Sequence, residues 1–442
     1  MDASADESAA TRAYDPTADV VEHCQSLIRL DSSNYGDDSG PGERKAAEYV
    51  ADVLSRAGLD PTIVEHGPGR ANVLARWEGA DPGAEPLLLH GHLDVVPAQA
   101  QDWSFDPFAG EVVDGFVTGR GAVDMKDFDA MILSVLTARQ AAGAQPRRPV
   151  VLAFTADEEA GSRHGAHRLV EEQAEWFEGC TEAIGEVGGF SAEINGQRLY
   201  LIESGEKGMA WMRLTAWGTA GHGSMRHPDN AVSSLARAIA AIGDYEWPVQ
   251  PGPSMTLLLD KVRELTGATT GDPDELIAAF GPAARMIGAG IRNTTNPTML
   301  SAGYKVNVVP EEANAYLDGR FLPGQQDSFT EQVRALAGTS VDVDVQTGDV
   351  ALETDFRGDL VDAMTTSLLA EDPTAHIAPF LMSGGTDAKA WSRLGVRSFG
   401  FTPLRLPPDL DFTALFHGVD ERVPVDALTF GARVLDRFLD RA

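Results

Sequence analysis

A histidine and a carboxylate two residues apart offer the first candidate metal site. His92 and Asp94 lie in Leu87-Leu-Leu-His-Gly-His-Leu-Asp-Val-Val-Pro97, at the expected carboxyl end of an apolar strand. Residues two apart on a strand share a face, so Asp94 can accept the second N–H of a metal-binding His92 imidazole. A lone His-x-Asp pair is more often structural, but α/β sheets bind ligands at this end of their strands. The position therefore favours a metal site.

A second carboxylate is placed on a glycine-rich turn. Asp124 ends Gly119-Arg-Gly-Ala-Val-Asp before the start of an expected helix. One carboxylate has two oxygens and can bridge two metal ions about 3.5–4 Å apart, as in two-metal hydrolysis. The alternative is an ordinary helix-capping aspartate, which is the commoner fate of an isolated Asp in such a turn.

Two adjacent acids follow another apolar run. Glu158 and Glu159 lie in Phe154-Thr-Ala-Asp-Glu-Glu-Ala-Gly-Ser162. Neighbouring side chains at a strand end diverge, so Glu159 can bind a metal while Glu158 takes a proton from the attacking water. The alternative is a solvated acidic loop, a serious one in a chain with 67 Asp and Glu against 35 Lys and Arg.

Glu186, at the end of a further strand, and His417, in Leu415-Phe-His-Gly-Val-Asp-Glu-Arg422, complete a set of ligands. Each of two ions then has one histidine and one acid, and both share an aspartate. Such an oxygen and nitrogen set suits Zn²⁺, with Co²⁺ or Mn²⁺ as substitutes. The full candidate set is His92, Asp124, Glu159, Glu186 and His417.

Strands alternating with helices must position these residues. Such alternation indicates an α/β sheet covered by helices on both faces. Apolar runs predict strands at 62–65, 72–77, 86–92, 150–155 and 183–187, and helical spacing predicts helices at 41–58, 127–142 and 424–439.

The pattern changes near Lys207. An alternating strand at 209–217 precedes a helix at 231–242, capped by Asp229, and strands at 298–306 and 312–321 follow. This order predicts a small α+β module inserted in the first domain, and Trp211 and Trp217 are expected to pack within it. We therefore expect a catalytic domain in two parts, 1–208 and 323–442, with the module at 209–322.

The motifs together resemble the aminoacylase/carboxypeptidase family of clan MH metallopeptidases, which includes acetylornithine deacetylase, succinyl-diaminopimelate desuccinylase and bacterial glutamate carboxypeptidase. The resemblance covers the chain from about Val20 onward. It implies a zinc-exopeptidase-like domain, a mixed sheet between helices, with a ferredoxin-like lid and dimerisation domain. It also implies His92 and Glu186 on one zinc, Glu159 and His417 on the other, and Asp124 between them. Glu158 is then the general base, and Asp94 orients His92.

The same resemblance assigns residues outside the metal set. His222, in Ala220-Gly-His-Gly-Ser224, matches a lid loop whose histidine reaches a neighbouring active site and steadies the oxyanion, which implies a homodimer through the lid. The alternative is an exposed histidine with no catalytic role. Arg320 would grip a substrate carboxylate, for which a planar guanidinium is suited, and Asn296 is a candidate for the same role. Gly385 and Thr386 match a loop that contacts substrate through its backbone.

The resemblance also indicates a class of substrate, and the chain departs from the family pattern at one position. Glu186 stands where acylases and carboxypeptidases have Glu and aminopeptidases Asp, which favours an N-acyl amino acid or short peptide with a free carboxylate. The alternatives are a dipeptidase or aminopeptidase on the same fold, and a catalytically silent zinc-binding protein. Asp127 replaces a common glycine, and we interpret it as an acid that favours the start of the helix.

The composition of the chain argues against two classes of binding partner. The net charge of −32 repels nucleic acid phosphates and anionic membranes, so neither is expected as a partner. Met1–Thr17 lacks the basic start and apolar core of a signal peptide, and no apolar run approaches the roughly 18 residues of a membrane span. Cys24 and Cys180 form no metal-binding pattern. We therefore expect a cytoplasmic protein.

Overall fold

The computed structural model describes residues 14–442, so most of the stretch inspected for a signal peptide lies outside it. Two compact units divide the chain. Among the described residues, the first unit comprises 14–191, 357–375 and 390–442, and the second comprises 192–356 and 376–389. Each unit is therefore built from separate stretches of sequence, as expected when one module is inserted into another.

A mixed sheet forms the centre of the first unit, with strand order β1-β2-β6-β3-β7-β18. The pairs β6–β3, β3–β7 and β7–β18 are parallel, whereas β1–β2 and β2–β6 are antiparallel. The strands are β1 (Thr62–Gly67), β2 (Arg70–Trp77), β3 (Leu87–His92), β6 (Val150–Thr155), β7 (Glu182–Gly185) and β18 (Arg397–Gly400). The predicted α/β architecture is confirmed.

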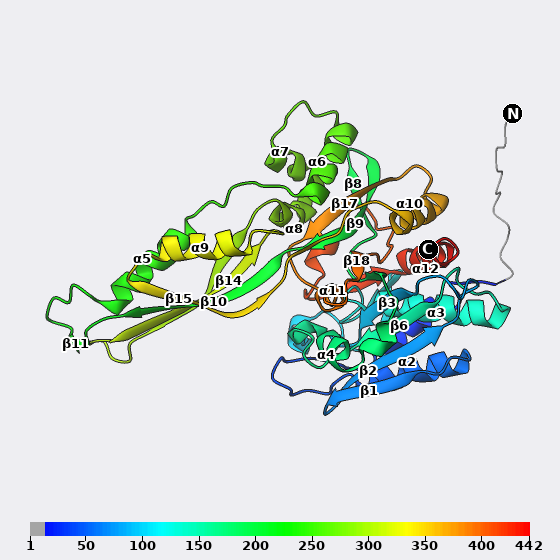
Figure 1. Ribbon diagram of the computed structural model, residues 1–442, viewed down its shortest axis with the longest axis horizontal. Coiled ribbons are helices and arrows are strands. Elements are labelled where there is room, and N and C mark those ends of the chain that lie inside the picture. The colour runs from blue at the N-terminus through cyan, green and yellow to red at the C-terminus, as the bar shows by residue number, and fades with distance from the viewer. Residues whose placement is uncertain (1–13) are drawn as a thin grey trace. The chain divides into compact units, whose positions relative to one another are not determined.

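Helices cover both faces of this sheet (Figure 1). On one face, α4 and Trp391 pack over Leu88 and Val151. Elsewhere α1, α3 and α12 pack against one another, and α2 packs on β2. The helices of this unit are α1 (Val20–Ile28), α2 (Arg44–Arg56), α3 (Lys126–Ala142), α4 (Ala166–Glu172), α10 (Asp359–Glu371) and α12 (Val425–Leu439). Because both faces of the sheet are covered, β3 and β6 are buried along their whole length, and the apolar runs that begin β3 and fill most of β6 are the pattern that predicted them.

A three-stranded sheet, in the order β19-β5-β4, lies in the same unit. Its strands are β4 (Glu111–Val113), β5 (Phe116–Thr118) and β19 (Arg422–Pro424). The pairing of β5 with β19 is antiparallel and joins Thr118 to Arg422. It therefore brings the turn that carries Asp124 beside the segment that carries His417.

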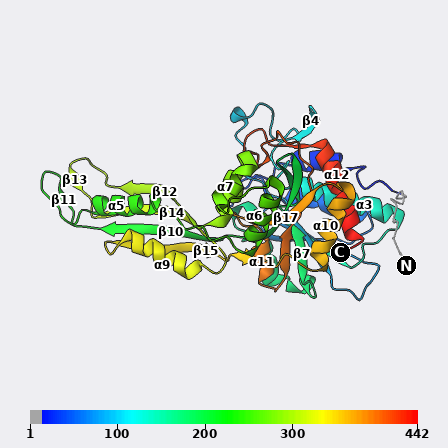
Figure 2. The same cartoon turned by 90° about the horizontal axis from the view of Figure 1, so that it is seen from above.

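The second unit contains a four-stranded antiparallel sheet in the order β12-β14-β10-β15 (Figure 2). Along the chain the elements run β10, α5, β12, β14, α9 and β15, the β-α-β-β-α-β order of ferredoxin-like modules. Their bounds are β10 (Gly208–Trp217), α5 (Ala231–Gly243), β12 (Thr294–Ala302), β14 (Glu312–Phe321), α9 (Gln326–Ala337) and β15 (Val341–Asp349). The module thus continues past residue 322, the boundary expected from the sequence, because β15 pairs along β10.

Helices α5 and α9 cover one face of this sheet (Figure 1), where Met212 and Leu214 meet Leu235 and Phe329. Two expectations for the module were wrong. Trp211 and Trp217 are 48% and 55% exposed, because alternate β10 residues point to the face opposite the helices. The cap of α5 is Asn230, whose side chain accepts from Ser233 N, whereas the Asp229 carboxylate binds Thr219.

The rest of the second unit surrounds β9 (Gln197–Glu206), which pairs with β17 (His376–Met382) in parallel and with β16 (Leu352–Glu353) antiparallel. The long stretch after α5, whose structure the sequence did not indicate, folds into three helices, and the first of them packs on β17. The remaining elements are β8 (Phe190–Ile194), β11 (Gly221–His222), α6 (Pro253–Thr266), α7 (Pro273–Ile277), α8 (Ala284–Gly288), β13 (Val308–Val309) and α11 (Ala388–Ser392).

None of the helices within residues 14–442 combines the length and the hydropathy that crossing a membrane requires.

Candidate metal centre

Three adjacent parallel strands bring candidate ligands to one edge of the first unit's sheet. His92 ends β3, Glu186 directly follows β7, and Glu159 lies in the short 3₁₀ turn Glu158–Ala160 after β6. Parallel strands with the same direction end at the same edge, so these side chains meet there. Asp124, just before α3, and His417, in the loop before β19, come from the two segments that the β5–β19 pair holds side by side.

The first candidate group contains His92, Asp124 and Glu186, with one potential ligand atom of each within 4.8 Å of the others. His92 Nε2 lies 3.0 Å from Asp124 Oδ1 and 3.4 Å from Glu186 Oε2. His92 and Glu186 are buried, and the fully buried β3 holds the imidazole rigidly. One nitrogen and two oxygens therefore converge on a point at the strand ends.

The second group contains Asp124, Glu159 and His417. His417 Nε2 lies 3.0 Å from Glu159 Oε2 and 3.2 Å from Asp124 Oδ2. The other oxygen of Glu159 accepts from Val96 N at 3.3 Å, which fixes the carboxylate from behind. Asp124 belongs to both groups and faces each histidine with a different oxygen, the arrangement that a bridging carboxylate requires.

Close packing of acids and imidazoles shifts their proton affinities strongly. Hydrogen bonds to Asp124 and Glu159 raise the pKa of His417 to about 10. Burial raises the pKa of Asp124, but hydrogen bonds from His417 and His92 outweigh it and hold that pKa below its usual range. Burial also raises the pKa of Glu159. The carboxylates that favour a proton on each imidazole would equally favour a divalent ion in its place.

The loop residues beside the two groups are held by a buried ion pair. Arg120 Nη1 lies 2.7 Å from Glu421 Oε2, and Glu421 Oε1 accepts from Val123 N at 2.8 Å. Arg120 Nη2 also donates to the His417 carbonyl at 3.4 Å. This pair ties the loop of Asp124 to the loop of His417.

Asp94 contacts His92 differently from the sequence-based expectation. His92 Nδ1 lies 2.9 Å from the backbone carbonyl of Asp94 and 3.6 Å from its carboxylate. The carboxylate instead accepts backbone N–H groups of Glu158 and Glu159, at 3.1 and 3.2 Å. Asp94 therefore orients the turn that carries the acids, while its carbonyl orients the imidazole.

Two residues near the candidate metal centre, His90 and Asp127, are buried and belong to neither ligand group. His90 is buried with its ring packed edge-to-face against Trp391, and burial lowers its pKa to about 3, so it is a neutral packing residue. Asp127 lies in the first turn of α3, as predicted, but the helix cap is Met125 and the Asp127 side chain is fully buried. Its place in the first turn agrees with the interpretation as an acid that favours the start of the helix, and the structure adds that the carboxylate is shielded from solvent.

The residues proposed to contact substrate belong to the second unit. His222 is exposed on β11, and its Nδ1 lies 2.9 Å from Ser224 Oγ. Arg320 donates through Nε and Nη2 to both oxygens of Asp318, at 2.6 and 3.0 Å. Asn296 on β12 lies directly opposite Asp318 in the strand register. Arg320 is thus paired with Asp318, and Asn296 is the cross-strand neighbour of that aspartate.

Gly385 and Thr386 lie together at a second place in this unit. Thr386 donates to the buried Glu206 through its backbone N, at 3.0 Å, and through Oγ1. A Cβ at Gly385 would meet Lys389 Nζ at 2.6 Å, so a side chain there would displace the lysine. The loop is therefore held by buried charged residues.

Sequence reasoning missed a group of buried polar residues next to Asp94. Asn34, Glu43, Arg70 and Asp157 all have 5% exposure or less. They come from four separate segments, so no spacing connects them. The only sequence signal for this group was composition, because its charged members occur within stretches that are otherwise apolar or rich in glycine.

Comparison with known proteins identifies the family. Residues 88–441 match the family model described as Peptidase family M20/M25/M40. The chain belongs to this family. It is a hydrolase of the metallopeptidase class, and the family predicted from its motifs is confirmed.

Curated relatives span most of the chain. Succinyl-diaminopimelate desuccinylase of Paracoccus denitrificans (strain Pd 1222) is 29% identical over 436 residues, covering 96% of this chain and 99% of the relative. The human N-fatty-acyl-amino acid synthase/hydrolase PM20D1 is 30% identical over 371 residues, covering 79% of this chain and 72% of that protein. Aminoacylase-1 of Sus scrofa is 25% identical, with 87% and 86% covered.

Solved structures share the fold. The M20 family metallo-carboxypeptidase Sso-CP2 of Sulfolobus solfataricus superposes with a TM-score of 0.72 at 18% identity, covering 96% of this chain and 98% of that one. The dipeptidase Dug1p of Saccharomyces cerevisiae gives a TM-score of 0.70 at 15% identity, with 96% and 95% covered. The fold class is thereby confirmed.

Proposed function

We propose that the protein hydrolyses the amide bond of an N-acyl amino acid or short peptide with a free carboxylate, using Glu158 as general base beside two Zn²⁺ ions. The observation that carries this proposal is the pair of ligand groups that share Asp124, with Glu158 adjacent to the ligand Glu159. Curated relatives named aminoacylase-1 and succinyl-diaminopimelate desuccinylase support this substrate class.

The chemistry of the donor atoms supports two zinc ions. His92, Asp124 and Glu186 would hold one ion, and Asp124, Glu159 and His417 the other. Each set offers one imidazole nitrogen and two carboxylates, which suits Zn²⁺ and leaves a position open for substrate. When bound, the ions lower the pKa of the attacking water and polarise the scissile carbonyl.

The protein's own residues then position and move protons. Asp94 holds the backbone of Glu158, and the Glu158 carboxylate takes a proton from the attacking water. The same carboxylate returns the proton to the leaving nitrogen, so one group serves both halves of the reaction. His222 would donate to the oxyanion as it develops.

The substrate carboxylate is assigned to Arg320. Its Nε and Nη2 are engaged by Asp318, which fixes the plane of the guanidinium and leaves Nη1 for another acceptor. Asn296, opposite Asp318 in the register, can add an amide N–H to the same carboxylate. Gly385 and Thr386 would contribute backbone contacts to substrate.

Substitution of Glu158 tests the proposal. In Glu158→Ala we expect both ions to remain bound, because Glu158 is in neither ligand group, while kcat falls by roughly 10²–10⁴-fold. The measurements are zinc content by mass spectrometry and initial rates on a panel of N-acyl amino acids. Glu171→Ala is the control, since Glu171 is an exposed acid on α4.

The same panel separates the alternatives. Dipeptides with a free amine, assayed beside N-acyl amino acids, would be preferred by an aminopeptidase or dipeptidase. A zinc-loaded wild-type protein that hydrolyses neither class would instead be a silent zinc-binding protein. Full turnover by metal-loaded Glu158→Ala would remove Glu158 from the mechanism while leaving the substrate class open.

Assembly and location belong to the same proposal. The edge strand β12 exposes Met299 and Leu300, at 64% and 67%, and exposed apolar edge strands pair with other chains. We propose a homodimer through this module. Cys24 and Cys180 are free and buried, which is compatible with the cytoplasmic location that we propose.

A further inference from the structure

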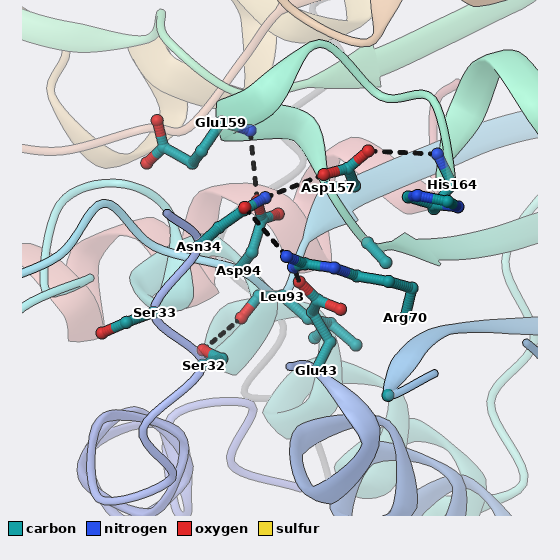
Figure 3. Close-up of polar contacts among 12 residues, drawn as sticks. Ser32, Ser33, Asn34, Glu43, Arg70, Leu93, Asp94, Asp157, Glu159 and His164 are labelled. Atoms are coloured by element: carbon teal, nitrogen blue, oxygen red, sulfur yellow. Dashed lines mark hydrogen bonds and ion pairs between the residues drawn. The ribbon is translucent and has the colours of Figure 1, made fainter. Parts of the chain in front are cut away.

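A single asparagine lies between two buried carboxylates beside the candidate metal centre (Figure 3). Asn34 Nδ2 donates to Asp94 Oδ2 at 2.8 Å and to Asp157 Oδ1 at 2.9 Å. Its Oδ1 accepts from Arg70 Nη2 and from Gly36 N, both at 3.0 Å. All four hydrogen-bonding positions of the amide are therefore used.

The two carboxylates that Asn34 joins hold the turn with the catalytic acids. Asp94 accepts the backbone N–H groups of both Glu158 and Glu159. Asp157 begins this turn in the left-handed region, at φ 65°, and its second oxygen accepts from His164 N at 3.1 Å. Asp94 follows β3 and Asp157 follows β6, so Asn34 connects the ends of two neighbouring strands.

A buried ion pair supports the asparagine from behind. Arg70 Nη1 lies 2.5 Å from Glu43 Oε1, and Arg70 is 3% exposed and Glu43 fully buried. Two buried carboxylates such as Asp94 and Asp157 repel each other unless donors or a cation lie between them. The amide of Asn34 supplies the donors, and the Arg70 guanidinium behind it supplies the positive charge (Figure 3).

We propose that Asn34 is a positioning residue for hydrolysis: by clamping Asp94 to Asp157, with Arg70 and Glu43 as its support, it fixes the turn that carries Glu158 and Glu159. This inference rests on the proposed function. It assigns a role to residues 34, 43 and 70, which precede the stretch that matches the family, residues 88–441.

Only an amide meets the requirements of this position. Aspartate has the same shape but offers no N–H donor and adds a third carboxylate to the pair. Serine keeps one hydroxyl donor, which can serve one carboxylate but cannot reach both. The order of effect is therefore Asn34→Asp more severe than Asn34→Ser, the reverse of what side-chain volume alone predicts.

The test compares Asn34→Asp and Asn34→Ser with Asn293→Ala in the full chain. Asn293 is a matched control, since it is 6% exposed against 5% for Asn34, and its side chain hydrogen bonds to Gln325 and Leu322 in the second unit. Four quantities are measured: thermal midpoint, zinc affinity by chelator competition, kcat and KM.

For Asn34→Asp we expect kcat to fall roughly 10–100-fold with KM changed less than about threefold, and one of two zinc equivalents to bind roughly tenfold more weakly because Glu159 is loosened. For Asn34→Ser we expect kcat and zinc affinity between those of Asn34→Asp and those of the wild type. Asn293→Ala should lower the thermal midpoint while leaving kcat and zinc affinity unchanged.

Three results would overturn the positioning role. One is a folded Asn34→Asp with wild-type kcat and zinc affinity, and another is a kcat loss in Asn293→Ala equal to that of Asn34→Asp. The third is failure of both Asn34 variants to fold while Asn293→Ala folds, which would make the network purely structural. If wild type binds zinc but hydrolyses no substrate, the proposed function fails, and the zinc affinities still decide the role of Asn34.

Discussion

At the scale of single residues, the candidate site depends on how each carboxylate divides its two oxygens. Asp124 gives Oδ1 to His92 and Oδ2 to His417, whereas Glu159 gives one oxygen to His417 and the other to Val96 N. Asp94 gives both of its oxygens to backbone amides and Asn34. Acids that look equivalent in sequence thus differ in their neighbours, which suits Asp124 to the proposed role of bridge, Glu159 to that of ligand and Asp94 to that of support.

Arg320 gives a prediction at this scale. Lysine at position 320 keeps the charge but lacks the fork that can hold Asp318 and a second carboxylate together. For Arg320→Lys we expect KM for an N-acyl amino acid to rise roughly tenfold or more, with a smaller change in kcat. Steady-state kinetics on the acid and on its C-terminal amide measure this effect, since the amide should be indifferent to the substitution.

Arg213→Lys is the matched control for this experiment. Arg213 lies on β10 of the same sheet and is paired in a similar way, with Glu312 and Asn314. Its substitution should leave both substrates unaffected. Equal losses on the acid and the amide in Arg320→Lys would show that Arg320 supports the module and does not recognise the carboxylate.

At the scale of elements, the accuracy of the sequence-based predictions follows the degree of burial. The predicted strand at 150–155 matches β6, and the predicted helix at 127–142 differs from α3 by one residue. Elements buried on both faces have apolar runs that show their type and limits. The exposed face of β10 has no such signal, which is why Trp211 and Trp217 were misplaced.

The candidate site was predicted to the extent that its residues lie at strand ends within short motifs. His92, Glu159 and Glu186 are of this kind, and the structure brings them together with Asp124 and His417. The support behind them was not predictable in this way. The contact of Asn34 with Arg70 joins residues 36 positions apart through tertiary structure alone, and no periodicity or spacing encodes it.

Asp127 gives a prediction at the scale of α3. Burial raises its pKa well above the usual value. The folded state therefore keeps a proton on Asp127 at pH values where the unfolded chain has lost it. Stability falls as pH rises from the pKa of Asp127 in the unfolded chain to its pKa in the folded state. Asparagine at position 127 does not titrate, so the substitution removes this dependence of stability on pH. We expect Asp127→Asn to unfold with a free energy higher by roughly 1 kcal/mol or more at pH 8, and with little gain near pH 4.

Urea denaturation of both proteins at several pH values measures this difference. Asp327→Asn is the control, because Asp327 also lies in the first turn of a helix, α9, but is exposed. Its substitution should give no gain that grows with pH. A gain of the same size at pH 4 and pH 8 in Asp127→Asn would mean that packing, and not the charge, is responsible.

At the scale of the whole molecule, the two units carry different parts of the proposed mechanism. The ligand groups and Glu158 belong to the first unit, whereas His222 and Arg320 belong to the second. By family resemblance, His222 would act at the active site of a neighbouring subunit. Catalysis would then require the homodimer, and a monomer would lack an oxyanion donor.

Mixing two inactive variants tests this arrangement. Glu158→Ala retains His222, and His222→Ala retains Glu158, so a mixed dimer contains one site with both residues if the histidine acts in trans. Random exchange of equal amounts makes half of the dimers mixed, each with one complete site of two, which restores about a quarter of wild-type activity. Rates are measured after co-refolding, with each variant refolded alone as control.

The recovered activity distinguishes a His222 that acts in the partner's active site from one that acts in its own. A histidine acting within its own subunit gives no complete site in any dimer. Activity of the mixture equal to the mean of the separate variants would therefore exclude action in trans. Sedimentation should show the dimer, at twice the 47.1 kDa of the chain. Introducing charge at the β12 edge with Leu300→Glu in both variants should abolish the recovery, since it removes the surface through which we propose that the subunits pair.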